Sequence, residues 1–360
     1  MNTTEPPVAR LIAGGAAQDG SVDAVELLPG IYASTGITNS YLVTTADGSV
    51  VINAGSAPEA RRAHVPRYRR IDPDPPVYVI TTQSHRDHIG GVEELLGPSS
   101  RWIAHESSTS WRAEVRKLND LYLRRNQVLW ARIQSGLGLD MGPRAGPDCE
   151  PDILVGDSWV FELGAQRFEL YATPGGETTD SIVVWLPDQQ VVFTSNLFGP
   201  KFGGLPNLST LRGDKLRSAQ GYIASLERVR ALRPDVLITG HGDPIVGADE
   251  IDHALCRMRD AVRYIHDRTV AGMNDGRDLW TLMREIELPP DLAVHEEYGN
   301  IRWTVRSIWH EYIGWFRMES TTELYPVPAS AVAGDIVEVA GAAELVDRAR
   351  RHLEGGRPVE

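Results

Sequence analysis

Cysteine is nearly absent from this sequence of 360 residues, and long apolar runs are missing altogether. The two cysteines, Cys149 and Cys256, are far apart and match no paired ligand spacing, which argues against a disulfide framework or a thiolate zinc site. No apolar stretch is long enough to cross a bilayer, and residues 1–18 lack the basic start and apolar core of a signal peptide. We therefore expect a cytoplasmic protein that has no membrane partner.

Basic clusters are also scarce, and this scarcity excludes another class of partner. The sequence has 49 Asp and Glu against 36 Lys and Arg, a formal net charge of -13, and its basic runs are short pieces such as Arg67–Arg70. Nucleic acids and anionic membranes attract basic surfaces, so neither is an expected partner. A small anionic substrate remains compatible with this charge, provided that a local cationic pocket receives it.

Apolar runs that end in polar residues predict strands through the first 250 residues, and the pattern then changes to helix. The apolar runs that predict strands end near residues 53, 81, 194 and 240. From Ile251 to Phe316 nearly everything is typical of helix, with breaks at Asn274–Gly276 and Pro289–Pro290. A large partner surface is needed to cover the aromatic residues of this region, which are Tyr264, Trp280, Trp303, Trp309, Tyr312 and Trp315. A helical appendage that forms a homodimer interface is the simplest interpretation.

The most informative segment is Thr81–Gly91, which places two imidazoles and a carboxylate within four residues directly after an apolar run. His85, Asp87 and His88 leave a strand end on one loop, and three such side chains can converge on a divalent metal ion. Taken alone, the motif has an alternative interpretation as a capping loop with solvated polar groups. It therefore needs support from elsewhere in the chain.

Two further strand ends provide that support. Glu177 lies in a tight glycine turn that would hold its carboxylate rigidly, although an acidic side chain on a surface turn is the alternative. His241 follows a strand and precedes Gly242, which lets the backbone bend closely under the imidazole, although a structural histidine is the alternative. Three strand ends with metal-ligand chemistry in one chain favour a metal site over coincidence.

Three segments, spaced as they are in this chain, resemble the motifs of the metallo-β-lactamase superfamily: Ser84–Gly91, Thr173–Gly175 and Thr239–Gly242. The resemblance covers Ile31 to Val246, and it implies an α/β protein with an αββα sandwich, a site at one rim of the sandwich and a C-terminal all-helical extension. The similarity is closer to the alkylsulfatase branch, because Gly175–Glu177 is similar to the segment that carries the acidic metal ligand of that branch.

The same resemblance extends towards the C-terminus. Residues 207–213 are similar to the sulfate-pocket segment of the alkylsulfatases, and residues 263–269 with 312–316 are similar to their helical dimerisation domain. The implied domains are a catalytic domain over residues 20–248, a helical dimerisation domain over 249–326 and a C-terminal tail with a short helix over 327–360.

Carried over residue by residue, the resemblance implies a metal site formed by Gln83, His85, Asp87, His88, Glu177, Asn196 and His241. Two of these residues depart from the family pattern: Gln83 stands in place of the opening histidine, and Asn196 stands where an acidic residue is expected. If two ions bind, Gln83, His85 and Glu177 would form one site and Asp87, His88 and His241 the other, whereas a single ion is the alternative. Zinc, as one or two ions, is the implied cofactor, and iron is the alternative because a glutamate ligand suits both metals.

The expected activity is metal-dependent hydrolysis of a small anionic ester, a sulfate ester or a related compound, by metal-activated water. Asp87 would orient or deprotonate that water. The expected substrate pocket consists of Asn207, Thr210 and Arg212, with Arg212 as a bidentate clamp on the anion. Two alternatives stay open: an iron-dependent redox or oxygen enzyme on the same scaffold, and a catalytically degenerate binding protein, which Gln83 and Asn196 motivate.

Overall fold

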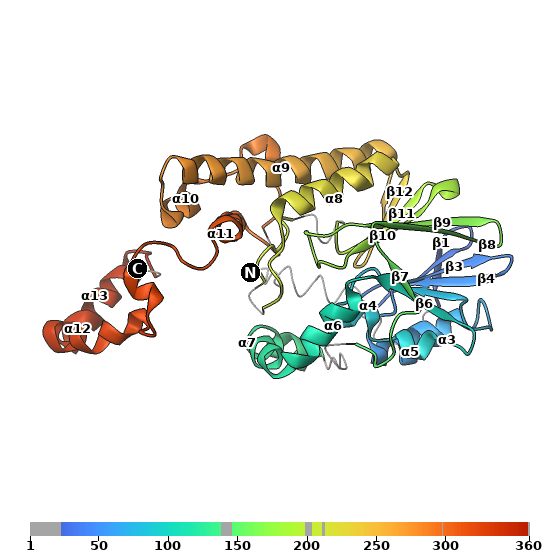
Figure 1. Cartoon of the computed structure of the whole chain (residues 1–360), viewed down its shortest axis with the longest axis horizontal. Helices are drawn as coiled ribbons and strands as arrows, with labels where there is room; N and C mark the ends of the chain where they lie inside the picture. Colours follow the sequence, from blue (N-terminus) through green and yellow to red (C-terminus); the bar gives the residue numbers. More distant parts are fainter. Residues whose placement is uncertain (1–22, 138–145, 199–203, 211–212, 297, 359–360) are drawn as a thin grey trace, which may run out of the picture. The chain divides into compact units, whose positions relative to one another are not determined.

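The computed structural model describes residues 23–137, 146–198, 204–210, 213–296 and 298–358 (Figure 1). The chain divides into two compact units, Met1–Glu311 and Tyr312–Glu360. None of the described helices is both long enough and apolar enough to cross a membrane.

Two sheets form the centre of the first unit. One sheet has seven strands in chain order, and the other has six strands in the order β13-β12-β11-β10-β9-β8. The first sheet contains β1 (Val25–Leu28), β2 (Ile31–Ser34), β3 (Ser40–Thr45), β4 (Gly48–Ile52), β5 (Tyr78–Ile80), β6 (Arg101–His105) and β7 (Ile153–Val155). The second contains β8 (Ser158–Leu163), β9 (Gln166–Ala172), β10 (Ile182–Leu186), β11 (Val191–Ser195), β12 (Val236–Thr239) and β13 (Ile245–Val246).

The strands alternate between two apolar faces, as the period of two in a strand requires. Ile52 and Ile80 of the first sheet belong to the same buried cluster as Val184 and Ile238 of the second, so these side chains fill the space between the sheets. The neighbouring Val51 belongs to a separate cluster on the outer face of the first sheet. A strand that is buried on both faces explains the nearly continuous apolar runs of the sequence.

Helices cover both outer faces, which completes the αββα order and confirms the predicted fold class (Figure 1). Helices α3 and α5 pack on the first sheet, whereas α8 and α9 pack on the second. The described α-helices of the first unit are α2 (Ala57–Glu59), α3 (Val65–Tyr68), α4 (Arg86–Ile89), α5 (Val92–Leu95), α6 (Ser108–Lys117), α7 (Asn119–Leu137), α8 (Ala219–Leu232), α9 (Ala248–Asn274), α10 (Leu279–Glu285) and α11 (Ile301–Ile313). The last two residues of α11 enter the second unit. The π-helix η1 (Ala60–His64) and the short 3-10 helices η2 (Pro187–Gln189) and η4 (Pro290–Leu292) also belong to the first unit. The predicted break after Asn274 coincides with the end of α9.

The second unit contains α12 (Ala333–Ala340) and α13 (Ala342–Glu354), preceded by the short 3-10 helices η5 (Thr321–Leu324) and η6 (Ala329–Val332). None of its described residues is buried. Apolar side chains are instead widely exposed, with 90% of Val339, 83% of Met318 and 65% of Leu353 accessible to solvent. Apolar exposure on this scale is typical of a surface that another chain covers.

A buried histidine behind the first sheet makes the stability of the protein depend on pH. His64 is fully buried in η1, and its Nδ1 lies 2.7 Å from the hydroxyl oxygen of Ser34. Burial, together with the positive charge of Arg67, lowers the pKa of His64 to about 3. An unfolded histidine has a pKa of about 6.5, so below that pH the unfolded chain binds a proton that the folded chain rejects.

The unfolding free energy should therefore fall as the pH decreases from about 6.5 towards 3, with His64 contributing at most about 1.4 kcal/mol per pH unit. We expect the substitution His64→Gln to flatten this slope in urea unfolding measured across the window. The exposed His253 provides a matched control, because His253→Gln should leave the slope unchanged. Equal slopes for the wild type and His64→Gln would contradict the prediction.

Candidate metal centre

The polar residues predicted from strand ends gather at one rim of the sandwich, where the two sheets meet. His85 and His88 follow β5, Asn196 follows β11 and His241 follows β12. Because β11 and β12 are parallel neighbours, their carboxyl ends reach the same edge. A backbone hydrogen bond of 2.8 Å from Asn39 to the carbonyl oxygen of Gly240 joins the two sheets at this edge.

Asp87, His88 and His241 form a compact group of ligand atoms that all lie within 4.8 Å of one another. The Nε2 of His88 is 3.4 Å from Oδ2 of Asp87, and the Nε2 of His241 is 3.7 Å from the same oxygen. The two imidazole rings meet at 84° with their centroids 5.7 Å apart. Two imidazoles and one carboxylate are a donor set that suits a divalent transition metal with an open position for water.

The far nitrogen of each imidazole is fixed by a contact outside this group. The Nδ1 of His241 lies 2.5 Å from the carbonyl oxygen of Ile37, and the Nδ1 of His88 lies 3.2 Å from the hydroxyl oxygen of Ser195. A carbonyl oxygen only accepts, so Nδ1 of His241 carries the proton and Nε2 keeps its lone pair. Such contacts orient the rings of metal-binding histidines and fix their tautomers.

The charges of this group match the protonation states that metal binding requires. Burial lowers the pKa of His241 to about 4, although the negative charge of Asp87 opposes the shift. Burial alone would raise the pKa of Asp87, but the neighbouring imidazoles of His88 and His241 outweigh it and hold this pKa well below the ordinary value. The hydroxyl of Thr38 also donates to Oδ2 of Asp87 at 2.8 Å. Near neutral pH His241 thus offers a neutral imidazole and Asp87 an ionised carboxylate.

Two buried polar atoms at this point make no hydrogen bond among the described residues: Oδ1 of Asn196, and Nε2 of His88, which lies 3.4 Å from the carboxylate of Asp87. Both border Gly240, since a Cβ atom on this glycine would lie 2.7 Å from Oδ1 of Asn196 and 3.0 Å from Cε1 of His88. A buried acceptor without a partner is costly, and a bound cation with its water would satisfy both atoms. The residues therefore fit a metal ion, and glycine at 240 permits their close approach.

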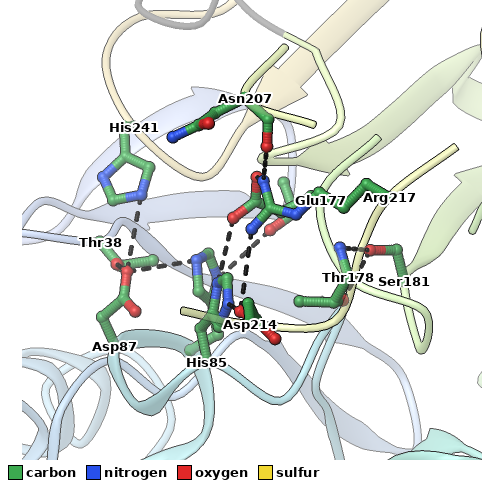
Figure 2. A network of polar contacts seen from close by, with 12 residues as sticks. Thr38, His85, Asp87, Glu177, Thr178, Ser181, Asn207, Asp214, Arg217 and His241 are labelled. Atoms are coloured by element: carbon green, nitrogen blue, oxygen red, sulfur yellow. Dashed lines mark hydrogen bonds and ion pairs between the residues drawn. The ribbon is translucent and has the colours of Figure 1, made fainter. Parts of the chain in front are cut away.

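A second cluster of four buried side chains adjoins the first (Figure 2). The Nδ1 of His85 lies 3.1 Å from Oε1 of Glu177, and its Nε2 lies 3.2 Å from Oδ2 of Asp214. Nη1 of Arg217 donates to Oε2 of Glu177 at 2.9 Å, and Nη2 lies 3.9 Å from Oδ2 of Asp214. The exposed fractions of the side chains are 9% for His85, 3% for Glu177, 6% for Asp214 and 1% for Arg217.

The remaining predicted residues are Gln83, Asn207, Thr210 and Arg212. Gln83 is buried, and its Nε2 has no hydrogen-bond partner among the described residues. The side-chain oxygens of Asn207 and Thr210 are likewise buried without such partners, while the backbone carbonyl of Asn207 accepts a hydrogen bond of 2.9 Å from Arg217. Arg212 falls outside the described residues.

The sequence interpretation missed Thr38, Asp214 and Arg217. Thr38 lies before β3 in a loop without a recognisable motif. For Asp214 and Arg217 the sequence offers only a weak signal, which is their charge just before the N-cap of α8 at Ser218. Charged residues before a helix usually stay solvated, so their type alone did not predict burial.

Facing mixed sheets between helices, with histidines and carboxylates at the strand ends of one rim, define the class of αββα metalloproteins. The profile of the metallo-beta-lactamase superfamily matches residues 33–241, and the chain belongs to this superfamily. The profile of alkyl sulfatase dimerisation matches residues 281–358. The predicted boundaries at residues 248 and 326 stay predictions.

The similarity to alkylsulfatases extends over most of the chain. The chain is 28% identical over 330 residues to a linear primary-alkylsulfatase of a Pseudomonas species, covering 85% of the chain and 61% of the relative. It is 24% identical over 339 residues to an alkyl/aryl-sulfatase of Saccharomyces cerevisiae, covering 86% of the chain and 51% of the relative. These matches confirm the predicted resemblance, although the chain spans little more than half the length of its relatives.

A solved structure shares the fold. The stereoselective inverting sec-alkylsulfatase Pisa1 from Pseudomonas sp. superposes with a TM-score of 0.79 at 22% identity, over 99% of this chain and 60% of the other. The predicted sandwich and the helical region after it therefore have a counterpart of known structure.

Proposed function

We propose that this protein hydrolyses sulfate esters with a metal ion, zinc in the first place, held by Asp87, His88 and His241. The observation that carries the proposal is the convergence of these three ligand atoms within 4.8 Å. Membership of the metallo-β-lactamase superfamily and similarity to alkylsulfatases support it. A hydrolase of this class needs ligands in fixed orientations and one open coordination position.

The residues of the site would have distinct roles. A bound metal ion would lower the pKa of a coordinated water and polarise the ester. Ile37 and Ser195 hold the two imidazoles in fixed orientations, and the carbonyl of Ile37 leaves the lone pair of His241 on Nε2. Asp87 stays ionised near neutral pH, which lets its carboxylate orient the attacking water or accept a proton from it.

The anionic end of the substrate needs donors, and the segment after residue 204 offers them. The buried hydroxyl of Thr210 has no partner among the described residues and can donate to a sulfate oxygen, as can the side-chain amide of Asn207. Arg212, which lies outside the described residues, is proposed from the sequence alone as a bidentate clamp on the anion. Zinc-loaded protein should therefore release sulfate from short alkyl sulfate esters, measured by ion chromatography.

Thr210→Val tests this pocket with almost no change in side-chain volume. Losing one hydrogen bond to an anion should raise KM about 10-fold or more, with a smaller effect on kcat. Ser209→Ala is a matched control, because Ser209 is an exposed neighbour. Metal-loaded protein that releases no sulfate from any tested ester would contradict the proposed function, and iron with oxygen-dependent turnover would favour a redox enzyme instead.

We further propose that the protein forms a homodimer through its C-terminal helices. The match to the alkyl sulfatase dimerisation profile and the exposed apolar side chains of residues 312–358 support this proposal. Light scattering at micromolar concentration should give about twice the chain mass of 39.7 kDa. A monomeric mass under these conditions would refute the proposal.

A further inference from the structure

We infer that this chain holds a single metal ion, at Asp87, His88 and His241, and that the buried cluster of His85, Glu177, Asp214 and Arg217 replaces a second ion. The inference rests on the proposed metal-dependent function for its first half. Its second half concerns the His85 cluster alone and can fail separately.

Fewer strong ligand atoms converge at the position of His85 than at the position of Asp87. A zinc site with three protein ligands draws them from imidazole, thiolate and carboxylate groups. Beside His85, Glu177 and Asp214 are both carboxylates, but they face opposite nitrogens of the imidazole, so only one of them can share a metal ion with a given nitrogen. The third residue in the predicted set is Gln83, whose neutral amide is a weaker ligand. The Asp87 group has three strong ligands within 4.8 Å. Two positions in one rim thus differ sharply in ligand strength.

The ligand atoms of His85 and Glu177 are already in contact with protein groups. Oε1 of Glu177 faces His85 at 3.1 Å, while Oε2 accepts a hydrogen bond from Arg217 at 2.9 Å. The other nitrogen of His85 faces Asp214 at 3.2 Å. Both ring nitrogens of His85 therefore face carboxylates, and both oxygens of Glu177 face nitrogens.

The charge of Arg217 opposes a cation at this position. A guanidinium is always protonated in proteins, so Arg217 places a permanent positive charge against Glu177. A divalent cation between His85 and Glu177 would be repelled by this charge at close range, in a site that water does not screen. Glu177 is instead compensated by Arg217, and Asp214 lies 3.9 Å from the same guanidinium.

Arg217 is also held firmly in place. Its side chain is 1% exposed, and its Nη1 also donates to the carbonyl oxygen of Asn207 at 2.9 Å. Its backbone nitrogen donates to the carbonyl oxygen of Leu208 at 3.1 Å. To admit a metal ion, the guanidinium would have to leave a buried position and break its side-chain contacts.

Metal stoichiometry tests the inference without reference to activity. After equilibrium dialysis against micromolar zinc, element analysis should find about one ion per chain in the wild type. His85→Ala should keep that ion, whereas His241→Ala should lose it. About two ions in the wild type, with one lost in His85→Ala, would overturn the inference and leave the proposed function intact. No ion in the wild type would overturn both.

A gain of binding provides the second test. The double substitution Gln83→His with Arg217→Met supplies a third strong ligand and frees Oε2 of Glu177, so zinc content should rise to about two ions per chain. Gln83→His alone should stay at about one ion, because the cluster keeps its cation. A rise to two ions in Gln83→His alone would show that Arg217 does not block the position. Arg228→Met is the matched control, since it removes an arginine paired with Asp157 away from the site.

Discussion

Replacing His88 and His241 together with alanine is expected to abolish metal binding and to reduce sulfate-ester hydrolysis at least about 1,000-fold. The reason is that catalytic zinc can lower the pKa of bound water to about 7, and this gain disappears with the ion. The substitution leaves Asp87 as the last strong ligand of its group, too few to hold zinc at micromolar concentration. Element analysis and sulfate release measure the two effects on the same sample.

The matched control uses two exposed histidines, His253 and His295, replaced by alanine in the same way. This variant should keep the metal content and the activity of the wild type. Circular dichroism should show that both double variants are folded, because neither substitution touches the cluster between the sheets. Metal and activity retained in the His88 and His241 variant would rule out the proposed centre.

The fold was predictable because its buried strands coincide with local apolar runs. The apolar run over Val77–Thr81 contains β5, and the run over Asp235–Gly240 contains β12. Both runs end in a motif with metal-ligand chemistry, so the local pattern alone was enough to predict His85, His88 and His241 at strand ends. The meeting of these strand ends at one rim follows from the superfamily topology, which a local pattern cannot provide.

The contacts behind the metal centre could not be predicted in the same way. Ile37 acts through its backbone carbonyl, which every residue type possesses. Asp214 and Arg217 are buried against His85 and Glu177, which lie far away in the sequence, and such contacts are a property of tertiary structure. No local pattern indicates that the guanidinium of Arg217 contacts Glu177. The glutamine at position 83, which stands in place of the histidine of the family motif, is visible in the sequence.

The burial of Arg217 also predicts a large effect on stability. Arg217→Ala should lower the unfolding free energy by about 3–5 kcal/mol, because removing one partner leaves Glu177 charged, buried and uncompensated. The pair of Arg228 and Asp157 provides the contrast, since 79% of the Asp157 side chain is exposed. Arg228→Ala should cost about 0–1 kcal/mol, the usual value for an exposed pair. Urea unfolding of the metal-free protein measures both.

A double-mutant cycle then separates the ion pair from simple loss of packing. If charge is the cause, Glu177→Gln should recover much of the stability that Arg217→Ala loses, because the buried carboxylate is neutralised. If packing of the guanidinium were the cause, the two substitutions would act additively. A strong coupling between positions 177 and 217 in metal-free protein would mean that Arg217 compensates Glu177 where a second metal ion would otherwise be needed. Additive effects would remove this explanation and leave the weak Gln83 ligand as the remaining reason for a single ion.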